Sequence, residues 1–393
     1  MNAIVSEEDF YNSFSKYQKH KLQDYNEVIR LSKIIENKLE ISRRTRVPKS
    51  TVQNWISNSS KPIGVIQLEK LKSIGLLPLI ESNDDKFLFF VELFAFLFGD
   101  GHLNKKFSVS NFCGEIKDLI KIKQMLKKLF GIHSNILSNK SFGKTIKIKN
   151  GVKEEKQIYG INNTLWLSSP SLNRLFFLAG AINGDKVKSN VLLPQWIMES
   201  DLVVKQKFLG VIFGNELQCP YLRTKGAFSS PQFGLHKVEN KISSLNLFLS
   251  QIKELLLEFG VESSEIKIEK YKTLRSKDKL LSSKSFFFIY SNPKNILRLF
   301  YSVPFIYASN KQEKFEFSVN KFLKINSGLK FDWGVYEKAM LLHKQGLGHV
   351  RIFKKLKLPK SYLYKLNYWI YYDKKPKYYA SKKEIKYICS LIE

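Results

Sequence analysis

The sequence predicts an α+β fold of two related repeats with antiparallel sheets, flanked at both ends by small all-α domains. Two similar apolar helical segments begin at Leu93 and Phe208, 115 residues apart, and each is followed by alternating strand-like and helical runs. Both ends of the chain carry helical patterns around a Pro-Lys-Ser turn. We expect four domains, over residues 1–82, 83–199, 200–328 and 329–393.

The composition indicates a folded protein with a polyanionic partner. Hydrophobic residues make up 44% of the 393 residues, and 65 Lys and Arg against 35 Asp and Glu give a net charge of +30. Such an excess of positive charge is typical of nucleic-acid-binding proteins. An A/T-rich genome would also enrich lysine, but it would not explain the shortage of acidic residues.

The chain is expected to be cytoplasmic and not membrane-bound. Its longest apolar run, residues 87–98, is interrupted by Glu92 and falls short of the roughly 20 residues that a membrane-spanning helix needs. No signal-peptide pattern begins the sequence. The cysteines have no paired spacing and predict neither a disulfide framework nor a zinc cluster; they are Cys113, Cys219 and Cys389.

The N-terminal domain contains a helix-turn-helix pattern over residues 41–62, ISRRTRVPKSTVQNWISNSSKP. A basic helix, a turn at Val47 and Pro48 and a capping Ser50 precede a second helix with Val52 and Trp55 on its inner face. The pattern resembles homeodomain-like or resolvase-like modules, whose second helix contacts bases in the major groove. A plain helical hairpin with a lysine-rich face is the alternative. The candidate DNA-binding residues are Lys49, Thr51, Gln53 and Asn54.

The same turn recurs as LPKS at residues 358–361, within the segment KLKLPKSYLYKLNYWIYYDKKP. Together with a helix over residues 337–344, it predicts a second helix-turn-helix domain, with Lys360 and Tyr362 as DNA-binding candidates. Seven tyrosines lie between Tyr362 and Tyr379. We favour their packing on the core of this small domain over stacking on single-stranded nucleic acid.

The first repeat begins with a helix that leads into LFAFLFGDGHL, residues 93–103. The capping residues NDD predict its start near Asp84, and Gly101 predicts its end. Ala95 and Gly99 lie four residues apart on one face, where a second helix can approach closely. Asp100 is then a carboxylate at the buried end of a packed helix, where a divalent metal is the expected counter-charge.

Each repeat is predicted to continue as two strands, a helix, two strands and a helix. In the first repeat, strands are expected at residues 107–112, 134–137, 144–149 and 157–167, and helices at 115–130 and 171–178. In the second, strands are expected at residues 221–223, 232–236, 265–270 and 285–290, and helices at 239–259, 293–301 and 312–322.

The second segment, FLGVIFGNE at residues 208–216, places Gly210 and Gly214 where Ala95 and Gly99 stand in the first. The two segments resemble the paired LAGLIDADG motifs of homing endonucleases, with residues 93–101 matched to 208–216. The resemblance covers residues 84–325 and includes GDK at 184–186 and LPQWI at 193–197. It implies a monomer of two pseudo-symmetric αββαββα repeats, whose sheets form a saddle on double-stranded DNA.

The resemblance also implies a metal site at the ends of the two motif helices, with two or more Mg²⁺ or Mn²⁺ ions beside the scissile phosphates. Asp100 fits the acidic position, but the matched residue in the second motif is Asn215, and Glu216 can supply a carboxylate one residue later. The metal-binding candidates are Asp100, Gly99, Asn215 and Glu216. The candidates for activating water or stabilising the transition state are Lys186 and Lys311, with Lys314 as a competitor.

Some of these residues have plainer explanations. On spacing alone, Asp100 would be a helix C-terminal residue in a local turn. His102 is more simply polar surface than a metal or phosphate contact, and Asp185 is more simply part of a turn between the repeats. Arg223 and Lys225, two basic residues after the second motif, are further DNA-binding candidates.

Together these patterns predict a site-specific endonuclease that binds double-stranded DNA and hydrolyses phosphodiester bonds with divalent metal. The catalytic candidates are Asp100, Glu216, Lys186 and Lys311. Because Asn215 stands where an acid is expected, cleavage would be impaired or limited to nicking. Two alternatives use the same surfaces: a transcriptional regulator on a decayed nuclease scaffold, which binds DNA without cutting it, and an RNA-splicing maturase.

Overall fold

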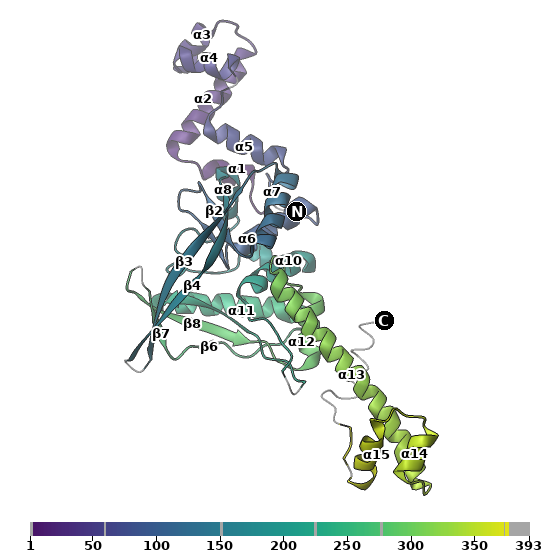
Figure 1. Ribbon diagram of the computed structural model, residues 1–393. Coiled ribbons are helices and arrows are strands. Elements are labelled where there is room, and N and C mark those ends of the chain that lie inside the picture. The colour runs from purple at the N-terminus through teal and green to yellow at the C-terminus, as the bar shows by residue number, and fades with distance from the viewer. Residues whose placement is uncertain are drawn as a thin grey trace.

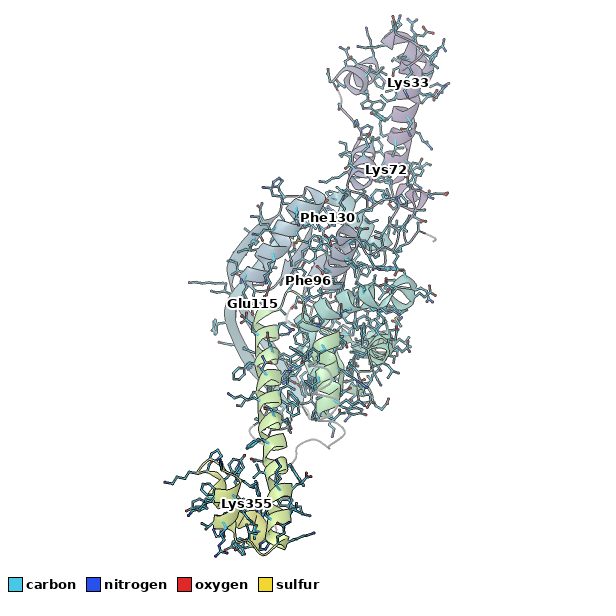
Figure 2. All side chains as sticks on the ribbon, turned by 90° about the vertical axis from the view of Figure 1, so that its right-hand side faces the viewer. Lys33, Lys72, Phe96, Glu115, Phe130 and Lys355 are labelled. Carbon is cyan, nitrogen blue, oxygen red and sulfur yellow. The ribbon has the colours of Figure 1, made fainter. Side chains whose placement is uncertain are left out.

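The computed structural model describes residues 3–58, 60–149, 152–223, 226–275, 278–372 and 374–376. The fold is mixed α+β with antiparallel strand pairing, as the sequence predicts. Figure 1 shows an elongated molecule, in which a central body carries the sheet and helices extend from it at both ends. Figure 2, turned by 90°, places Lys33 and Lys355 in helical units at opposite ends of the molecule.

The N-terminal unit contains α1 (Glu7–Asn12), α2 (Lys16–Ser32), α3 (Lys38–Thr45), α4 (Lys49–Ser57) and α5 (Ile63–Ser73). A small core joins α2, α3 and α4; its buried residues are Val28, Leu31, Ile41, Val47, Val52 and Trp55. The expected cap at Ser50 is wrong. Helix α4 begins at Lys49, directly after Pro48, whose non-helical ψ of 138° is that of an N-cap residue, and Ser50 lies inside the helix.

The first half of the central body has the overall pattern expected, but the individual strands differ: the strand at 101–103 was not expected, and the strands expected at 134–137 and 144–149 are one continuous strand. Its elements are α6 (Asp85–Phe96), β1 (Gly101–Leu103), β2 (Ser110–Cys113), α7 (Ile116–Phe130), β3 (Asn135–Lys149), β4 (Val152–Leu167) and α8 (Pro170–Leu178). The Asp84 carboxylate caps α6 by accepting hydrogen bonds from the next turn. The predicted end of α6 at Gly101 is wrong, because Phe98 N–H bonds to the Ala95 carbonyl and tightens the last turn early.

The second half contains α9 (Gln195–Glu199), α10 (Leu202–Glu216), β5 (Gln232–Val238), η1 (Glu239–Lys241), α11 (Ile242–Glu258), β6 (Lys267–Ile268), β7 (Lys272–Leu274), β8 (Leu281–Phe288) and α12 (Pro293–Ser302). Asp201 caps α10, as expected for the second motif helix. The strand expected at residues 221–223 is only an isolated bridge between Leu222 and Phe228. Strand β7 was not expected from the sequence.

A single helix, α13 (Ser309–Lys344), connects the central body to the C-terminal unit. It replaces the two helices expected at residues 312–322 and 337–344, and it runs through the domain boundary expected at 328. Its last turns pack with α14 (His349–Lys355) and α15 (Tyr362–Tyr371) around a separate core. Tyr362 is buried in that core, whereas four other tyrosines are exposed and contradict the predicted packing: Tyr364, Tyr368, Tyr371 and Tyr372. Tyr378 and Tyr379 lie outside the described residues.

One antiparallel sheet joins the two halves, in the order β1-β2-β4-β3-β7-β8-β5, with β6 paired to β8. The halves meet where β3 pairs with β7, from Ile146 opposite Leu274 to Ile148 opposite Lys272. Helix α7 packs on β3 and β4, and α11 packs on β5 and β8. In β4, Leu165 and Leu167 are fully buried, whereas Trp166 between them is 40% exposed. Because neighbours along a strand point to opposite faces, helices cover one face of the sheet and the other is open.

Within the described ranges, no helix combines the length and the apolar character that crossing a membrane requires.

Candidate functional site

The ends of the two motif segments lie against each other near the middle of the molecule. Aromatic rings of α6 and of the turn after it pack on α10, with centroid distances of 6.4 Å between Phe94 and Phe208 and 5.7 Å between Phe98 and Phe208. At Gly99, a Cβ atom would lie 3.2 Å from the Cβ of Asn215 and 3.5 Å from the Cγ of Glu216. A side chain at this position would crowd Asn215, so glycine favours the close approach of the two motif ends.

The glycines of α10 do not line the contact with α6, so this part of the prediction is wrong. A Cβ atom on Gly210 would lie 2.6 Å from the Pro304 carbonyl oxygen, and one on Gly214 would lie 2.6 Å from the Ile306 carbonyl oxygen. Ile306 N–H donates to the Gly210 carbonyl at 3.0 Å. These glycines make room for the segment that crosses α10 and leads into α13.

Two lysines hold the backbone immediately before the two acids. The Lys186 ammonium donates to the carbonyl oxygen of Gly99. The Lys311 ammonium donates to the carbonyl oxygens of Asn215, at 2.7 Å, and Leu217, at 3.2 Å. Each lysine follows the last helix of its own half, since Lys186 comes after α8 and Lys311 lies in the first turn of α13, after α12. Lys314, the competitor of Lys311, is exposed.

These bonds correct the way in which the two motifs correspond. Lys186 bonds to the residue before Asp100, and Lys311 bonds to the residue before Glu216. Asp100 therefore corresponds in space to Glu216, 116 residues later, and Gly99 corresponds to Asn215. The alignment of the two motifs by their glycines had placed Asn215 at the position equivalent to Asp100. We call Asp100, Glu216, Lys186 and Lys311 the carboxylate site.

Electrostatic coupling shows that the two acids share one environment. Burial, and then the negative charge of Asp100, raise the pKa of Glu216 to about 7. Asp100 is exposed to solvent, contrary to the expected burial, but protein atoms crowd its carboxyl group and this loss of solvation raises its pKa. Burial also lowers the pKa of Lys186 and of Lys311, and the two carboxylates oppose that effect.

The donor atoms of the carboxylate site suit a hard divalent cation. Two carboxylates and the carbonyl oxygens of Gly99 and Asn215 are oxygen ligands of the kind that Mg²⁺ and Mn²⁺ prefer. Both carbonyls already accept hydrogen bonds from ammonium groups, which compete with a cation for these oxygens, so the two carboxylates would be its main ligands. The part of the chain that the structure describes has no cluster of three or more His, Cys, Asp or Glu side chains placed to hold a metal. Water or phosphate oxygens would have to complete the coordination.

The sequence did not single out Lys237, whose side chain bonds to the backbone of Lys186 in the carboxylate site. Its buried ammonium donates to the carbonyl oxygens of Lys186 and, at 2.9 Å, of Ser189. Burial, and then the charge of Lys186, lower the pKa of Lys237 to about 8. A pocket of about 180 Å³ lies here, lined in part by Lys186, Glu216 and Lys237. The only sequence signal for a role of Lys237 was that a lysine occupies a buried position of strand β5.

Other candidates from the sequence are not part of the carboxylate site. Asp185 accepts hydrogen bonds from Arg275 at 2.6 Å and Val187 N–H at 3.1 Å, in keeping with a turn. His102 is an exposed residue of β1. The DNA-binding candidates at the surface are Lys49, Gln53, Asn54, Arg223 and Lys360, with Thr51 partly buried. Lys225 lies outside the described residues.

Tyr362 does not present a surface for base contacts, which corrects one predicted DNA-binding residue. It is 7% exposed and its hydroxyl donates to the Asp332 carboxylate. Burial and that carboxylate raise the pKa of Tyr362. The residue therefore belongs to the core that joins α13 to α15.

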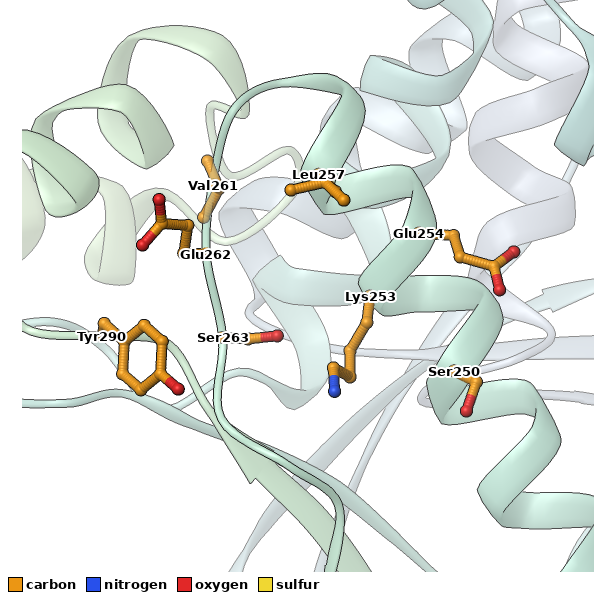
Figure 3. Close-up of a pocket in the computed structure, with 8 residues that line it drawn as sticks. All are labelled: Ser250, Lys253, Glu254, Leu257, Val261, Glu262, Ser263 and Tyr290. Carbon is orange, nitrogen blue, oxygen red and sulfur yellow. The ribbon is translucent and has the colours of Figure 1, made fainter.

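A separate pocket of about 480 Å³ lies at the end of α11 (Figure 3). The stick view shows Lys253 and Leu257 on the helix, with Val261–Ser263 and Tyr290 on the other side of the opening, whereas the Glu254 carboxylate extends away from them. It shares no lining residue with the carboxylate site. Its lysine and glutamates carry charges of both signs, so it offers no selective surface for a polyanion.

Comparison with known proteins gives partial similarities. No family model matches the chain. The chain is 29% identical over 314 residues to the DNA-directed RNA polymerase subunit Rpo1N of Methanocaldococcus jannaschii, covering 77% of this chain and 23% of that protein. It is 26% identical over 353 residues to the Replication factor C small subunit of the same organism, covering 83% of this chain and 18% of that protein. It is 32% identical over 211 residues to the tRNA-splicing ligase RtcB of Pyrococcus furiosus, covering 52% of this chain and 20% of that protein. The chain thus spans about a fifth of the length of these relatives.

Similarity to solved structures is weak. The homing endonuclease I-DmoI in complex with DNA and Ca matches with a TM-score of 0.32 and 12% identity, covering 56% of this chain and 91% of that one. Full-length DUF199/WhiA from Thermatoga maritima matches with a TM-score of 0.30 and 14% identity, covering 77% of this chain and 95% of that one.

Proposed function

We propose that this protein binds double-stranded DNA and hydrolyses its phosphodiester bonds at the carboxylate site, with a divalent metal. The observation that carries the proposal is the pairing of Asp100 with Glu216. In each case, the backbone carbonyl of the preceding residue accepts a hydrogen bond from a lysine ammonium group. A divalent cation bound there would polarise the phosphate and lower the pKa of a water molecule. The large positive charge of the chain supports a polyanionic substrate.

The residues of the site have distinct roles in this proposal. The Asp100 and Glu216 carboxylates bind the cation and must both be ionised to do so. The Lys186 and Lys311 ammonium groups hold the two acid-bearing ends and offset the negative charge that the carboxylates and the phosphate bring together. The open face of the sheet would take the duplex, and the exposed face of α4, with Gln53 and Asn54, would contact bases.

The distribution of relatives supports an element that moves between genes. The three relatives are named for different activities, and the similarity covers about a fifth of each. The similarity to each of them is therefore confined to a segment of that protein. A segment that occurs within unrelated genes fits a DNA endonuclease that promotes its own insertion, as the resemblance to LAGLIDADG motifs implies.

The experiment is cleavage of a library of duplex targets in Mg²⁺ or Mn²⁺, comparing wild type with Asp100→Asn and Glu216→Gln. We expect cut products from wild type and a loss of about 100-fold or more in each variant, because each removes a metal ligand. Glu254→Gln, an exposed carboxylate in the separate pocket of Figure 3, is the matched control and should cut normally. Equal cutting by all four proteins would refute the assignment of the site.

A wild-type protein that binds duplex DNA tightly but leaves it intact would instead support the non-cleaving regulator. The main sequence argument for that alternative was Asn215 in place of an acid. The position of Lys311 weakens this argument, since it pairs Glu216, and not Asn215, with Asp100.

A further inference from the structure

A basic groove lies between the N-terminal helices and the first half of the central body. Its volume is about 1010 Å³, and it is bounded by α2, by the starts of α4 and α5, by the loop between β1 and β2, and by α8. Five cationic side chains line it and no acidic side chain does; they are Lys21, Lys61, Lys105, Lys106 and Arg174. We call this the junction groove.

Two of these cations have carboxylate partners outside the lining. Lys61 pairs with Glu69 at 2.7 Å, and Lys21 lies 3.8 Å from Asp24. Lys105 and Lys106 are exposed, and no salt bridge to either occurs among the described residues. The groove therefore keeps a net positive charge after its own ion pairs are counted.

Arg174 gives the strongest indication that the groove binds an anion. Its side chain is 9% exposed, and its Nη1 atom donates to the Ser13 carbonyl oxygen at 2.7 Å. The guanidinium lies over the rings of Phe14, at 4.8 Å, and Phe107, at 5.1 Å. Its Nε atom is buried without a hydrogen-bond partner within the part of the chain that the structure describes. A buried cation with no carboxylate beside it is costly, so an anion in the groove would compensate it.

A short stretch of chain links the groove to the carboxylate site. Strand β1 (Gly101–Leu103) follows Asp100, and the loop that carries Lys105 and Lys106 follows β1. A three-residue strand spans about 10 Å, which is the length of about three base pairs of a duplex. At the other side of the groove stands Thr51, in the first turns of α4. A phosphate backbone that passes Asp100 can therefore continue through the groove to α4.

We propose that the junction groove binds the phosphate backbone of the DNA flank between the carboxylate site and α4, with Lys105 and Lys106 as phosphate contacts. The inference rests on the proposed function, because it takes duplex DNA as the partner. It adds a binding site that neither the carboxylate site nor the face of α4 includes. The exposed ring of Tyr17, 72% accessible at the rim, lies next to the path of the backbone.

The test measures the salt dependence of binding to a fluorescent 40-base-pair duplex of random sequence by anisotropy. The double variant Lys105→Glu, Lys106→Glu should reduce the slope of log affinity against log salt by about 2, since each lost phosphate contact removes about 0.9. The control Lys123→Glu, Lys127→Glu changes the net charge equally at exposed positions of α7, on the covered face of the sheet. Its slope should stay that of wild type.

A crosslinking experiment locates the DNA independently of charge. A benzophenone amino acid at Tyr17 should crosslink to the same duplex, whereas one at Leu257, which is 64% exposed beside the pocket of Figure 3, should not. If wild type binds DNA but the two lysine variants have equal slopes and the Tyr17 derivative gives no crosslink, the groove inference is wrong and the proposed function stands. If wild type does not bind the duplex, both fail together.

Discussion

Replacing Glu216 by glutamine should stabilise the protein at neutral and alkaline pH. Burial and the charge of Asp100 raise the pKa of Glu216 from 4.5 to about 7. The folded protein then holds this proton more tightly than the unfolded chain, so stability falls as pH rises from about 4.5 to about 7 and is constant above that. The difference between 4.5 and about 7 corresponds to roughly 3 kcal/mol at most. Because Glu216 is partly exposed, we expect about 1–3 kcal/mol.

The assay is urea denaturation followed by circular dichroism, in EDTA, at pH 5 and pH 8. Glu216→Gln keeps the size of the side chain and removes the charge, so it should match wild type at pH 5 and exceed it at pH 8. Adding Mg²⁺ at pH 8 should then stabilise wild type and leave the variant unchanged, since a ligand that binds only the folded state raises its stability.

The control variant is Asp100→Asn, which removes the charge that raises the pKa of Glu216. Its stability should begin to fall at the same pH as that of wild type, near the unfolded pKa of glutamate, but should stop falling at a lower pH, and the total fall should be smaller. Equal free energies of unfolding for wild type and Glu216→Gln at both pH values would refute the reasoning, because they would mean that the carboxylate is solvated as in the unfolded chain.

Three further predictions concern the start of the helix that carries Lys311, a glycine of α10 and a glycine of α13. The buried Asp118 carboxylate accepts hydrogen bonds from Ser309 N–H, at 2.9 Å, and from its hydroxyl, and so caps α13 from another helix. Asp118→Ala should cost about 1–2 kcal/mol and speed hydrogen exchange in the first turns of α13, as mass spectrometry would show; unchanged exchange there would contradict the capping role. Gly210→Ala puts a Cβ atom 2.6 Å from a carbonyl oxygen and should destabilise by about 1–3 kcal/mol. Gly328→Ala, in open space within α13, should instead stabilise by about 0.5–1 kcal/mol in urea denaturation.

The sequence predicted the features that local chemistry determines. Asp84 and Asp201 cap the two motif helices as expected, because an N-cap carboxylate acts on the next three residues alone. The helices of the first half were predicted for the same reason, whereas β1 was missed and β3 was divided into two strands. The contact between β3 and β7 joins residues far apart in the chain and leaves no local signal. Helix α13 was divided in prediction because Gly328 and Gly334 lower helix propensity, although packing at both ends keeps it continuous.

The correspondence of the two motifs was misjudged because similar glycines have different tasks. Gly99 allows the end of one motif to approach Asn215, whereas Gly214 makes room for the backbone of Ile306. Aligning the two motifs by their glycines therefore compared unlike positions. The acids were found by residue type, but only the bonds of Lys186 and Lys311 show which acid corresponds to which.

These contacts make the carboxylate site depend on both halves of the chain at once. Asp118, in the first half, caps the helix from which Lys311 reaches the second motif. Glu92 on α6 accepts hydrogen bonds from Lys207 on α10, at 2.8 Å, and from Tyr307, at 2.7 Å, in the segment that leads into α13. Either half alone would expose the apolar surfaces of α6 and α10 and leave a buried charge without its partner. A separated half should therefore neither fold stably nor retain half of the activity.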